Sequence, residues 1–218
     1  MKVLDNMTIH FITKIETPFP EKFGVPRQPL LVTEAIGIMR FPKNDFYVEA
    51  FRGISESSHL WLIFDFHLVE GPFNGLVRPP RYENKKKMGV YGTRSPHRPN
   101  KLGLSLVEFV NLEIDHEVRL TVRGVDLVDG TPIYDIKPYV PYSDCIEART
   151  PFERPEVYPV KWNCEAPAEK DLIEKVIALD PRPNQDKEAS DEYGVSIAGY
   201  NIRFRFLLDH FEIVSVLR

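Results

Sequence analysis

The chain has 218 residues, a formal net charge of −4, 43% hydrophobic residues and 28% charged residues. These values are ordinary for a folded protein with one large domain or two smaller ones, and the small negative charge argues against a nonspecific nucleic-acid coat while allowing a local basic face. No apolar run approaches the ~20 residues that cross a bilayer, and polar residues interrupt any hydrophobic region of a signal peptide, so we expect no membrane association.

Up to about Val140 the sequence pattern is mostly that of β-strands rich in aromatic and β-branched residues. In the first strand, Ile9, Phe11 and Thr13 recur at period two and are expected on one face. The predicted strands are residues 8–15, 46–51, 59–66, 104–114 and 118–128, with a further short strand after the turn signal Asp129-Gly130.

Two features indicate how these strands connect. Asp115-His116-Glu117 separates two of them and predicts a hairpin, and Gly124 marks a bulge or a close approach of two backbones. No convincing helix of four turns lies before Pro141. Many short strands without interleaved helices predict a closed or nearly closed β-barrel.

After Pro141 the pattern changes. Residues 141–167 are proline-rich and irregular, and residues 166–180 predict an amphipathic helix with Pro167 in its first turn and Asp180-Pro181 at its end. The apolar positions of this helix are Leu172, Ile173, Val176, Ile177 and Leu179.

The last part of the chain predicts two strands, residues 193–208 and 210–218, that form a hairpin around residues 208–210. The predicted fold class is therefore mainly β. It comprises an N-terminal β-barrel domain at residues 1–145 and a small α+β C-terminal domain at residues 146–218.

A basic stretch gathers eight cationic side chains and one carboxylate, Glu83, into residues 78–101. Arg94 and Arg98 could converge on one carboxylate or phosphate, which a guanidinium binds through two parallel hydrogen bonds; a solvated loop with surface arginines is the alternative. The flanking glycines and prolines favour a rigid, shaped loop. The lysine run at residues 85–87 could then steer phosphates.

Other polar motifs lie outside this stretch. Arg27 lies between prolines, and His59 begins an apolar strand, where a structural histidine is the more frequent role. Asp126 and Asp129 precede a tight turn, and turn aspartates usually cap backbone N–H groups, although a carboxylate here could bind amino or ribose hydroxyl groups of a cofactor. Arg182 follows the predicted helix between prolines, which simple helix termination also explains.

Several motifs are missing. No HExxH motif and no cysteine cluster indicates a zinc or iron site, and Cys145 and Cys164 have neither metal-ligand nor redox-pair spacing, so we expect reduced thiols in the cytoplasm and no metal. The chain lacks a phosphate-binding P-loop, a G-x-G-x-x-G fingerprint and a G-x-S-x-G elbow. From its residues alone, the sequence predicts a basic loop on a barrel that prefers an anionic partner, without naming a reaction.

Six segments of the chain resemble, in order and spacing, those of the TrmO family, also known as the TsaA-like or YaeB-like proteins: KFGVPRQP, SHLWLIFDF, VRPPR, MGVYGTRSPHRPNKLGLSLVE, DLVDGTPIYDIKPY and DPRP. The resemblance covers nearly the whole chain, and its central motif is long and highly specific. It implies a tRNA adenine-N6 methyltransferase that uses S-adenosylmethionine, with a β-barrel N-terminal domain and a small C-terminal domain, working as a homodimer.

The substrate implied by this resemblance is N6-threonylcarbamoyladenosine, just 3′ of the anticodon in tRNAs that read codons beginning with A. The expected partner is therefore the tRNA anticodon stem-loop. By the same resemblance, cofactor contacts fall on Pro26, Arg27, Gln28, Ser58, His59, Arg94, Leu104, Asp126, Leu127, Val128 and Asp129.

These implied roles are compatible with the chemistry of the side chains. Arginine suits the methionyl carboxylate, aspartate suits amino or ribose hydroxyl groups, and Leu104 can pack against adenine. The ureido nitrogen of the substrate is a poor nucleophile, so its proton must leave during or before attack, and a carboxylate or histidine within reach could accept it. The expected face for tRNA phosphates is Arg78, Lys85, Lys86, Lys87 and Arg98.

Asp180 and Arg182 match the family's DPRP motif and are the catalytic candidates on the substrate side. Family members commonly continue Ala-Tyr after this motif, whereas this chain has Asn184-Gln185. Two alternatives to tRNA methylation stay open: a non-catalytic barrel that binds RNA or a nucleotide, and a methyltransferase that acts on a small metabolite.

Overall fold

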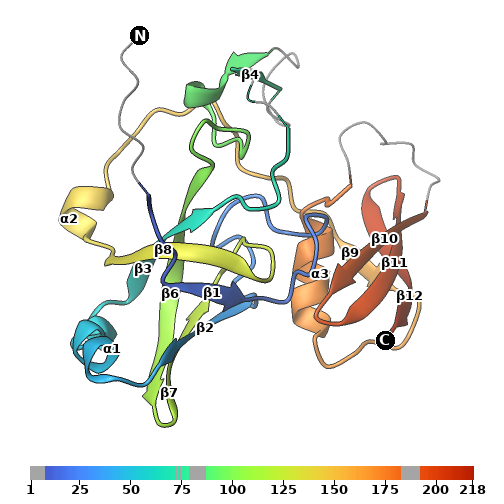
Figure 1. Cartoon of the computed structure of the whole chain (residues 1–218). Helices are drawn as coiled ribbons and strands as arrows, with labels where there is room; N and C mark the ends of the chain where they lie inside the picture. Colours follow the sequence, from blue (N-terminus) through green and yellow to red (C-terminus); the bar gives the residue numbers. More distant parts are fainter. Residues whose placement is uncertain (1–7, 72, 74, 79–86, 183–191) are drawn as a thin grey trace.

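The computed structural model describes residues 8–71, 73, 75–78, 87–182 and 192–218. Six antiparallel strands close into a barrel in the order β1-β2-β7-β6-β3-β8, so the predicted β-barrel is confirmed (Figure 1). The strands are β1 (Thr13–Glu16), β2 (Ile36–Pro42), β3 (His59–Asp65), β6 (Leu102–Ile114), β7 (Glu117–Arg123) and β8 (Thr131–Pro138).

Alternate side chains of the barrel strands point into its core. On β3, Leu60, Leu62 and Phe64 are buried, while the residues between them are partly exposed. This alternation follows from the pleat of a strand, in which successive side chains point to opposite faces.

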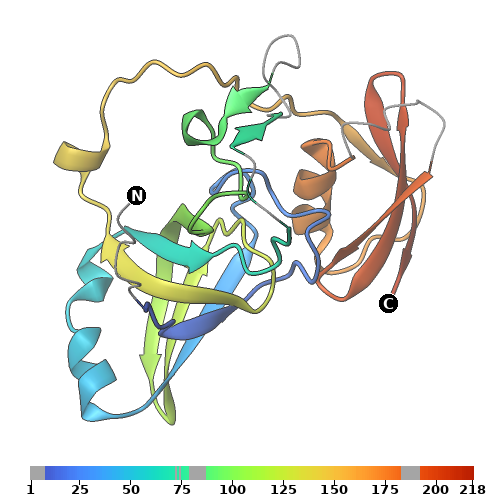
Figure 2. The same ribbon diagram turned by 45° about the horizontal axis from the view of Figure 1, so that its top comes forward.

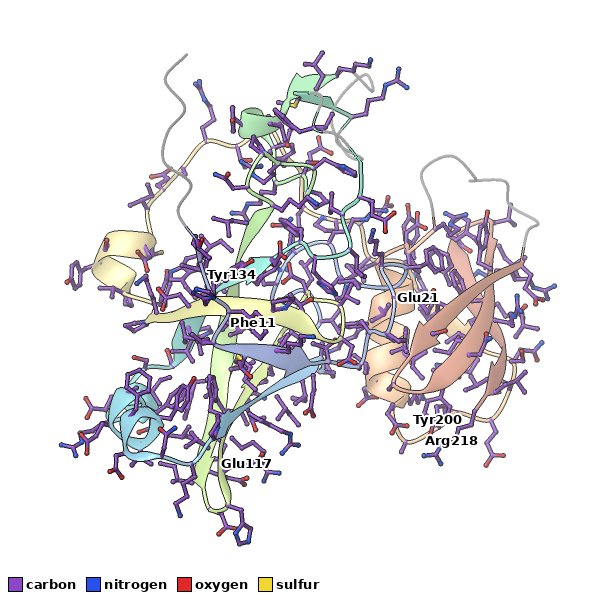
Figure 3. All side chains as sticks on the ribbon, in the orientation of Figure 1. Phe11, Glu21, Glu117, Tyr134, Tyr200 and Arg218 are labelled. Atoms are coloured by element: carbon purple, nitrogen blue, oxygen red, sulfur yellow. The ribbon has the colours of Figure 1, made fainter. Side chains whose placement is uncertain are left out.

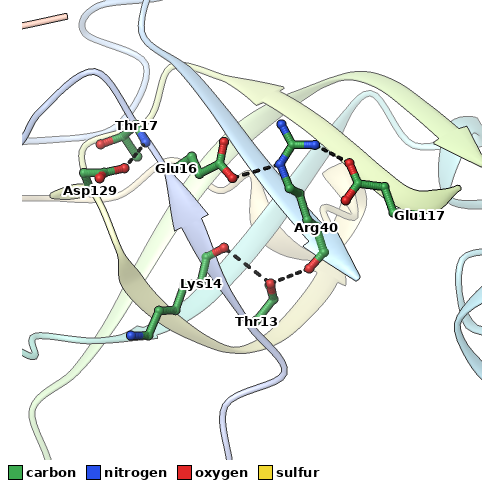
Figure 4. A network of polar contacts seen from close by, with 7 residues as sticks. All are labelled: Thr13, Lys14, Glu16, Thr17, Arg40, Glu117 and Asp129. Atoms are coloured by element: carbon green, nitrogen blue, oxygen red, sulfur yellow. Dashed lines mark hydrogen bonds and ion pairs between the residues drawn. The ribbon is translucent and has the colours of Figure 1, made fainter. Parts of the chain in front are cut away.

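An exposed polar cluster connects the short strand β1 to its neighbours (Figure 4). The Thr13 hydroxyl donates to the carbonyl of Arg40 on β2 at 2.7 Å, and the Arg40 guanidinium bonds Glu16 on β1 at 2.8 Å and also Glu117 on β7. Exposed ion pairs stabilise a protein little, so we expect this cluster to contribute little to stability.

The first predicted strand is shorter than expected. The ladder begins at Thr13, and Ile9 and Phe11 lie before it with 48% and 54% of their surface exposed. The predicted face is continued by Ile15, which is fully buried. Period two therefore identified the inward face, but it did not show where the ladder begins.

The strand predicted at residues 46–51 is wrong, because this segment forms helix α1 (Asp45–Ala50). The Asn44 side chain accepts a hydrogen bond from the backbone N–H of Tyr47 at 2.9 Å and caps the helix. Two of the three aromatic side chains that suggested a strand pack onto the barrel: the Phe41 ring centroid lies 5.1 Å from that of Tyr47 and 4.8 Å from that of Phe51. The third, Phe46, is exposed.

The predicted hairpin and the close approach at Gly124 are both confirmed. Strands β6 and β7 pair from Ile114↔Val118 onward, with Asp115 and His116 in the turn. Gly124 has φ +79°, and a Cβ atom there would lie 3.2 Å from the Leu30 Cα atom, so no larger side chain fits beside this backbone.

Several short elements accompany the barrel strands. The two-stranded ladder of β4 (Leu76–Val77) and β5 (Met88–Gly89) lies at the top of Figure 1, next to the 3₁₀ turn at Val90–Gly92. A second 3₁₀ turn at Ile54–Glu56 follows α1, and the short helix α2 (Pro141–Asp144) follows β8. From α2 the chain runs without regular structure to residue 159 and crosses in a wide arch to the C-terminal unit (Figure 2).

The C-terminal unit is one helix on a four-stranded sheet of order β10-β11-β12-β9. Its elements are β9 (Val160–Trp162), α3 (Lys170–Ala178), β10 (Glu192–Ile197), β11 (Tyr200–Leu207) and β12 (His210–Leu217). The helix and the closing hairpin are confirmed. The turn at Ala198–Gly199, which divides the predicted strand 193–208 in two, and the parallel pairing of β9 with β12 were not predicted.

Helix α3 lies between the barrel and this sheet, and the loop between β1 and β2 runs against both (Figures 1 and 2). The backbone N–H of Ala198 donates to the Pro18 carbonyl at 2.7 Å, and the backbone N–H of Ser196 donates to the Glu21 side chain at 3.3 Å. Glu21 accordingly lies beside the C-terminal unit in Figure 3. The loop therefore joins the two units.

In the described part of the chain, no helix has the length and apolar character that crossing a membrane requires.

Candidate functional site

A cavity of about 590 Å³ opens at one end of the barrel, where several loops meet. Its walls come from residues 22–29 before β2, from β3 and the segment after it (61–69), from residues 93–98 and the first residues of β6, and from the loop before β8 (126–131). The volume lies in the range of small-molecule sites. Antiparallel strands place these loops at the same end, although they are far apart in the sequence.

Eight of the eleven residues expected to bind a cofactor lie on the wall of this cavity. They are Pro26, Arg27, Gln28, Arg94, Leu104, Asp126, Leu127 and Val128.

Lys22, Arg27, Arg94 and Arg98 line the cavity and give it positive charge, and two of these arginines make contacts between loops. The Arg94 Nη1 atom donates to the Gln28 Oε1 atom at 2.5 Å, which links the loop after β5 to the loop before β2. The Arg27 Nη2 atom lies 3.4 Å from the backbone carbonyl oxygen of Asp180 in the C-terminal unit. Guanidinium groups on opposite loops can together hold a carboxylate or phosphate.

Arg98, expected on the RNA face, also supports the loop that carries Arg94. Its Nη1 atom donates to the carbonyl oxygens of Thr93 at 2.8 Å and of Val90 at 3.3 Å, and its guanidinium carbon lies 5.9 Å from the Tyr91 ring centroid. A guanidinium bound to backbone carbonyls in this way fixes a loop. The structure therefore gives Arg98 a structural contact that the charge pattern alone did not indicate.

Asp126 is the carboxylate of the cavity with the most perturbed environment. Burial raises its pKa to about 6, while the hydrogen bond from the Ser105 hydroxyl at 2.6 Å and the charge of Arg94 act in the opposite direction. At neutral pH the group is therefore mostly ionised, yet basic enough to take up a proton. Ser105 was missed from the sequence, because a serine within an apolar strand carries no distinctive signal.

The apolar wall contrasts with this charged wall. Leu104 lines the cavity with 55% of its surface exposed, and Phe64 packs against Gly103, where a Cβ atom would lie 2.3 Å from the Phe64 ring. An exposed leucine beside buried aromatic rings suits a flat apolar group such as a purine.

Further lining residues were not predicted as ligands. Trp61, Asp65, Phe66 and His67 belong to or directly follow the apolar segment that predicted only a strand, and His97 lies within the basic stretch. Their position in or beside motifs that carry the family resemblance was the one available signal.

Ser58 and His59 lie at the other end of β3. His59 is the first residue of this strand and Asp65, on the cavity wall, is the last, so about 20 Å separate the two ends. Asp129 is also not part of the wall; its side chain accepts the backbone N–H of Thr17 at 2.8 Å (Figure 4). The contact joins the loop before β8 to the end of β1, so it differs from the local capping expected of a turn aspartate.

The catalytic candidates Asp180 and Arg182 are buried, with 3% and 4% of their surface exposed. The Arg182 Nε atom lies 2.7 Å from Asp180 Oδ1, and its Nη2 atom lies 3.2 Å from Asp180 Oδ2. Neither residue lines the large cavity, although Asp180 lines an adjoining cavity of about 160 Å³. The two side chains bind each other and do not reach the wall of the large cavity.

Of the remaining residues expected to face RNA, Arg78 and Lys87 are exposed beside the β4–β5 ladder. Lys85, Lys86 and the Asn184-Gln185 pair lie outside the described residues. Among the side chains that the structure describes, no three His, Cys, Asp or Glu residues gather as a metal ion would require, and Cys145 and Cys164 are free thiols.

The chain is thus a closed antiparallel barrel with a charged and apolar cavity at its loop end, joined to a small helix-on-sheet unit. This architecture differs from the parallel-sheet nucleotide-binding folds. The family model for the tRNA-methyltransferase O N-terminal domain matches residues 14–145, and the model for the TrmO C-terminal domain matches residues 158–218. The chain therefore belongs to the TrmO family.

Similarity to individual proteins supports the same family assignment. A Pseudomonas aeruginosa protein, RcsF, whose name describes an S-adenosylmethionine-dependent methyltransferase, is 38% identical over 209 residues, covering 88% of this chain and 89% of its own. The tRNA (adenine(37)-N6)-methyltransferase of Escherichia coli is 36% identical over 221 residues, covering 93% of this chain and 94% of its own. The crystal structure of TrmO from P. aeruginosa has a TM-score of 0.80 and 32% identity, covering 98% of this chain and all of that one.

Proposed function

We propose that this protein is an S-adenosylmethionine-dependent tRNA methyltransferase that methylates N6-threonylcarbamoyladenosine next to the anticodon. The observation that carries the proposal is the barrel-end cavity, which places Arg27, Arg94, Asp126 and Leu104 around one space. Membership of the TrmO family and the names of the relatives support the reaction class and the cofactor.

The residues of the cavity fit the cofactor. S-adenosylmethionine carries a carboxylate, a ribose, an adenine and a sulfonium cation. Arg27 and Arg94 suit its carboxylate, the ionised Asp126 suits hydroxyl or amino groups, and Leu104 with Phe64 forms an apolar wall for the adenine. When bound, the cofactor supplies an electrophilic methyl group.

The protein's own contribution to the reaction is positioning and proton transfer. Holding the acceptor nitrogen about 3 Å from the methyl group, in line with the bond that breaks, supplies much of the rate. As the new N–C bond forms, the proton of the ureido nitrogen must leave. Asp126, Asp65, His67 and His97 are the described cavity residues that can accept a proton.

The anticodon stem-loop is the proposed partner, with Arg78 and Lys87 together with Lys85 and Lys86 on the phosphate-binding side. We keep the homodimer, the cytoplasmic location and the domain boundary between residues 145 and 146 as proposals. Light scattering on the purified protein tests the dimer, and limited proteolysis tests the boundary.

The experiment that tests the function is in-vitro methylation followed by nucleoside mass spectrometry. Purified protein, S-adenosylmethionine and tRNA containing threonylcarbamoyladenosine should yield the methylated nucleoside, while tRNA lacking that modification should not. Binding of tRNA without cofactor binding would favour the non-catalytic barrel instead. Methylation of small molecules alone would favour the metabolite enzyme.

A further inference from the structure

The Asp180–Arg182 ion pair follows helix α3, where the C-terminal unit meets the barrel. Both side chains are buried, and two N–O contacts of 2.7 and 3.2 Å join them. The Arg182 guanidinium carbon also lies 4.3 Å from the Phe206 ring centroid and 5.1 Å from that of Phe211. Burying two charges costs desolvation that their attraction often only offsets, so such a pair is weak evidence for stability.

The backbone of Asp180 has an uncommon conformation. Asp180 has φ +55°, in the left-handed region that few residues other than glycine adopt, although aspartate and asparagine tolerate it. Its backbone N–H donates to the Ile177 carbonyl at 3.1 Å. The ion pair joins residues 180 and 182 across Pro181, so it restrains the short backbone between them, which carries the Asp180 carbonyl group.

That carbonyl faces Arg27. The Arg27 Nη2 atom lies 3.4 Å from the Asp180 carbonyl oxygen, and Arg27 lines both the large cavity and the adjoining one, which Asp180 also lines. The same loop approaches the C-terminal sheet at Gly24, where a Cβ atom would lie 2.4 Å from the Val195 Cγ2 atom. The loop that presents Arg27 therefore takes its shape from the C-terminal unit.

We propose that Asp180 and Arg182 are positioning residues rather than catalytic ones: their ion pair fixes the Asp180 carbonyl, which orients Arg27 on the wall of the large cavity. The C-terminal unit thereby sets how tightly the cavity binds the carboxylate end of its ligand. This inference rests on the proposed function, because it takes S-adenosylmethionine as that ligand.

Calorimetric titration of the full-length protein with S-adenosylmethionine tests the inference. Asp180→Asn keeps the size of the side chain and the tolerance for positive φ but removes the charge. It should weaken binding about tenfold. Arg27→Ala should weaken binding by at least as much, and the double variant should bind no more weakly than Arg27→Ala alone, because both changes act through one contact.

The kinetic readout separates positioning from catalysis. With saturating cofactor, Asp180→Asn should keep its turnover rate within about threefold of the unaltered protein, while its KM for the cofactor rises. Turnover that falls by a factor of about 100 or more, with unchanged cofactor affinity, would overturn the inference. Lys175→Ala is the matched control, because it removes an exposed ion pair with Glu34 that also joins α3 to the loop between β1 and β2. This variant should bind the cofactor with unchanged affinity.

Removing one partner of a buried pair can prevent folding, so a second measurement leaves the pair intact. In ¹⁵N-labelled protein, saturating S-adenosylmethionine should shift the Arg182 Nε–H resonance, and in Arg27→Ala it should not. An Arg182 resonance that does not respond in the unaltered protein contradicts the inference, even though binding occurs. No binding at all to the unaltered protein overturns the proposed function, and the inference with it.

Discussion

Asp126→Asn tests the electrostatics of the cavity through stability rather than activity. Burial raises the Asp126 pKa from its ordinary value of 3.8 to about 6, so the folded protein holds this proton more tightly than the unfolded chain. Stability is therefore lost as the pH rises from about 4 through 6. At about 1.4 kcal/mol per pKa unit, the ionised carboxylate costs the folded state about 3 kcal/mol above pH 7, and about half of that at pH 5.

Asparagine carries no charge and its side-chain oxygen can still accept from Ser105, so Asp126→Asn removes the pH-dependent cost. The free energy of unfolding is measured in urea at several pH values. As the pH rises, the variant should become more stable relative to the unaltered protein, by about 1.4 kcal/mol between pH 5 and pH 7.5. The same dependence of the unfolding free energy on pH in both proteins would refute this reasoning.

Glu108→Gln provides a control of opposite sign. Hydrogen bonds from Arg123 lower the Glu108 pKa, so this carboxylate contributes stability that is present above its unfolded pKa and lost as the pH falls. Replacing Glu108 by glutamine should lower the free energy of unfolding by well under about 1 kcal/mol at neutral pH, because the ion pair with Arg123 is partly exposed.

Three further predictions concern the cofactor cavity, the contact between the units and the RNA face. Arg94→Ala should abolish methyl transfer while the unfolding curve stays within about 1 kcal/mol of the original, since Arg94 is exposed; full activity would remove this residue from the site. Gly24→Ala should cost about 1–3 kcal/mol in urea unfolding, because its φ is +89° and Val195 occupies the space of a Cβ atom. Lys87→Ala should weaken tRNA binding and reduce the slope of log affinity against log salt by about one, whereas an unchanged slope would place Lys87 away from phosphate.

The barrel could be predicted because the alternation of apolar residues that indicates its strands lies within short stretches of sequence. On β3, alternating burial follows directly from the sequence, and Gly124 marks the place where Leu30 approaches. Helix α1 was not predicted, because the aromatic content of residues 46–51 is typical of a strand and outweighs the single capping signal of Asn44. The parallel strand β9 was missed as well, since three residues in a proline-rich segment carry little periodic signal.

The candidate site was predictable only through resemblance. Arg27, Arg94 and Asp126 are far apart in the sequence, and nothing local indicates that they share a cavity. Arg182 packs against Phe206 and Phe211, and Asp180 binds Arg182, so the burial of the pair depends on tertiary packing. The motif alone could not distinguish a catalytic pair from a positioning pair.

The most direct test of the central claim is a crystal structure of this protein with S-adenosylhomocysteine, the demethylated form of the cofactor. The ligand is predicted in the barrel-end cavity, with its carboxylate on Arg27 or Arg94, its adenine against Leu104, and Asp126 within hydrogen-bond distance. Density for the ligand at another surface, with these four residues untouched, would contradict the account.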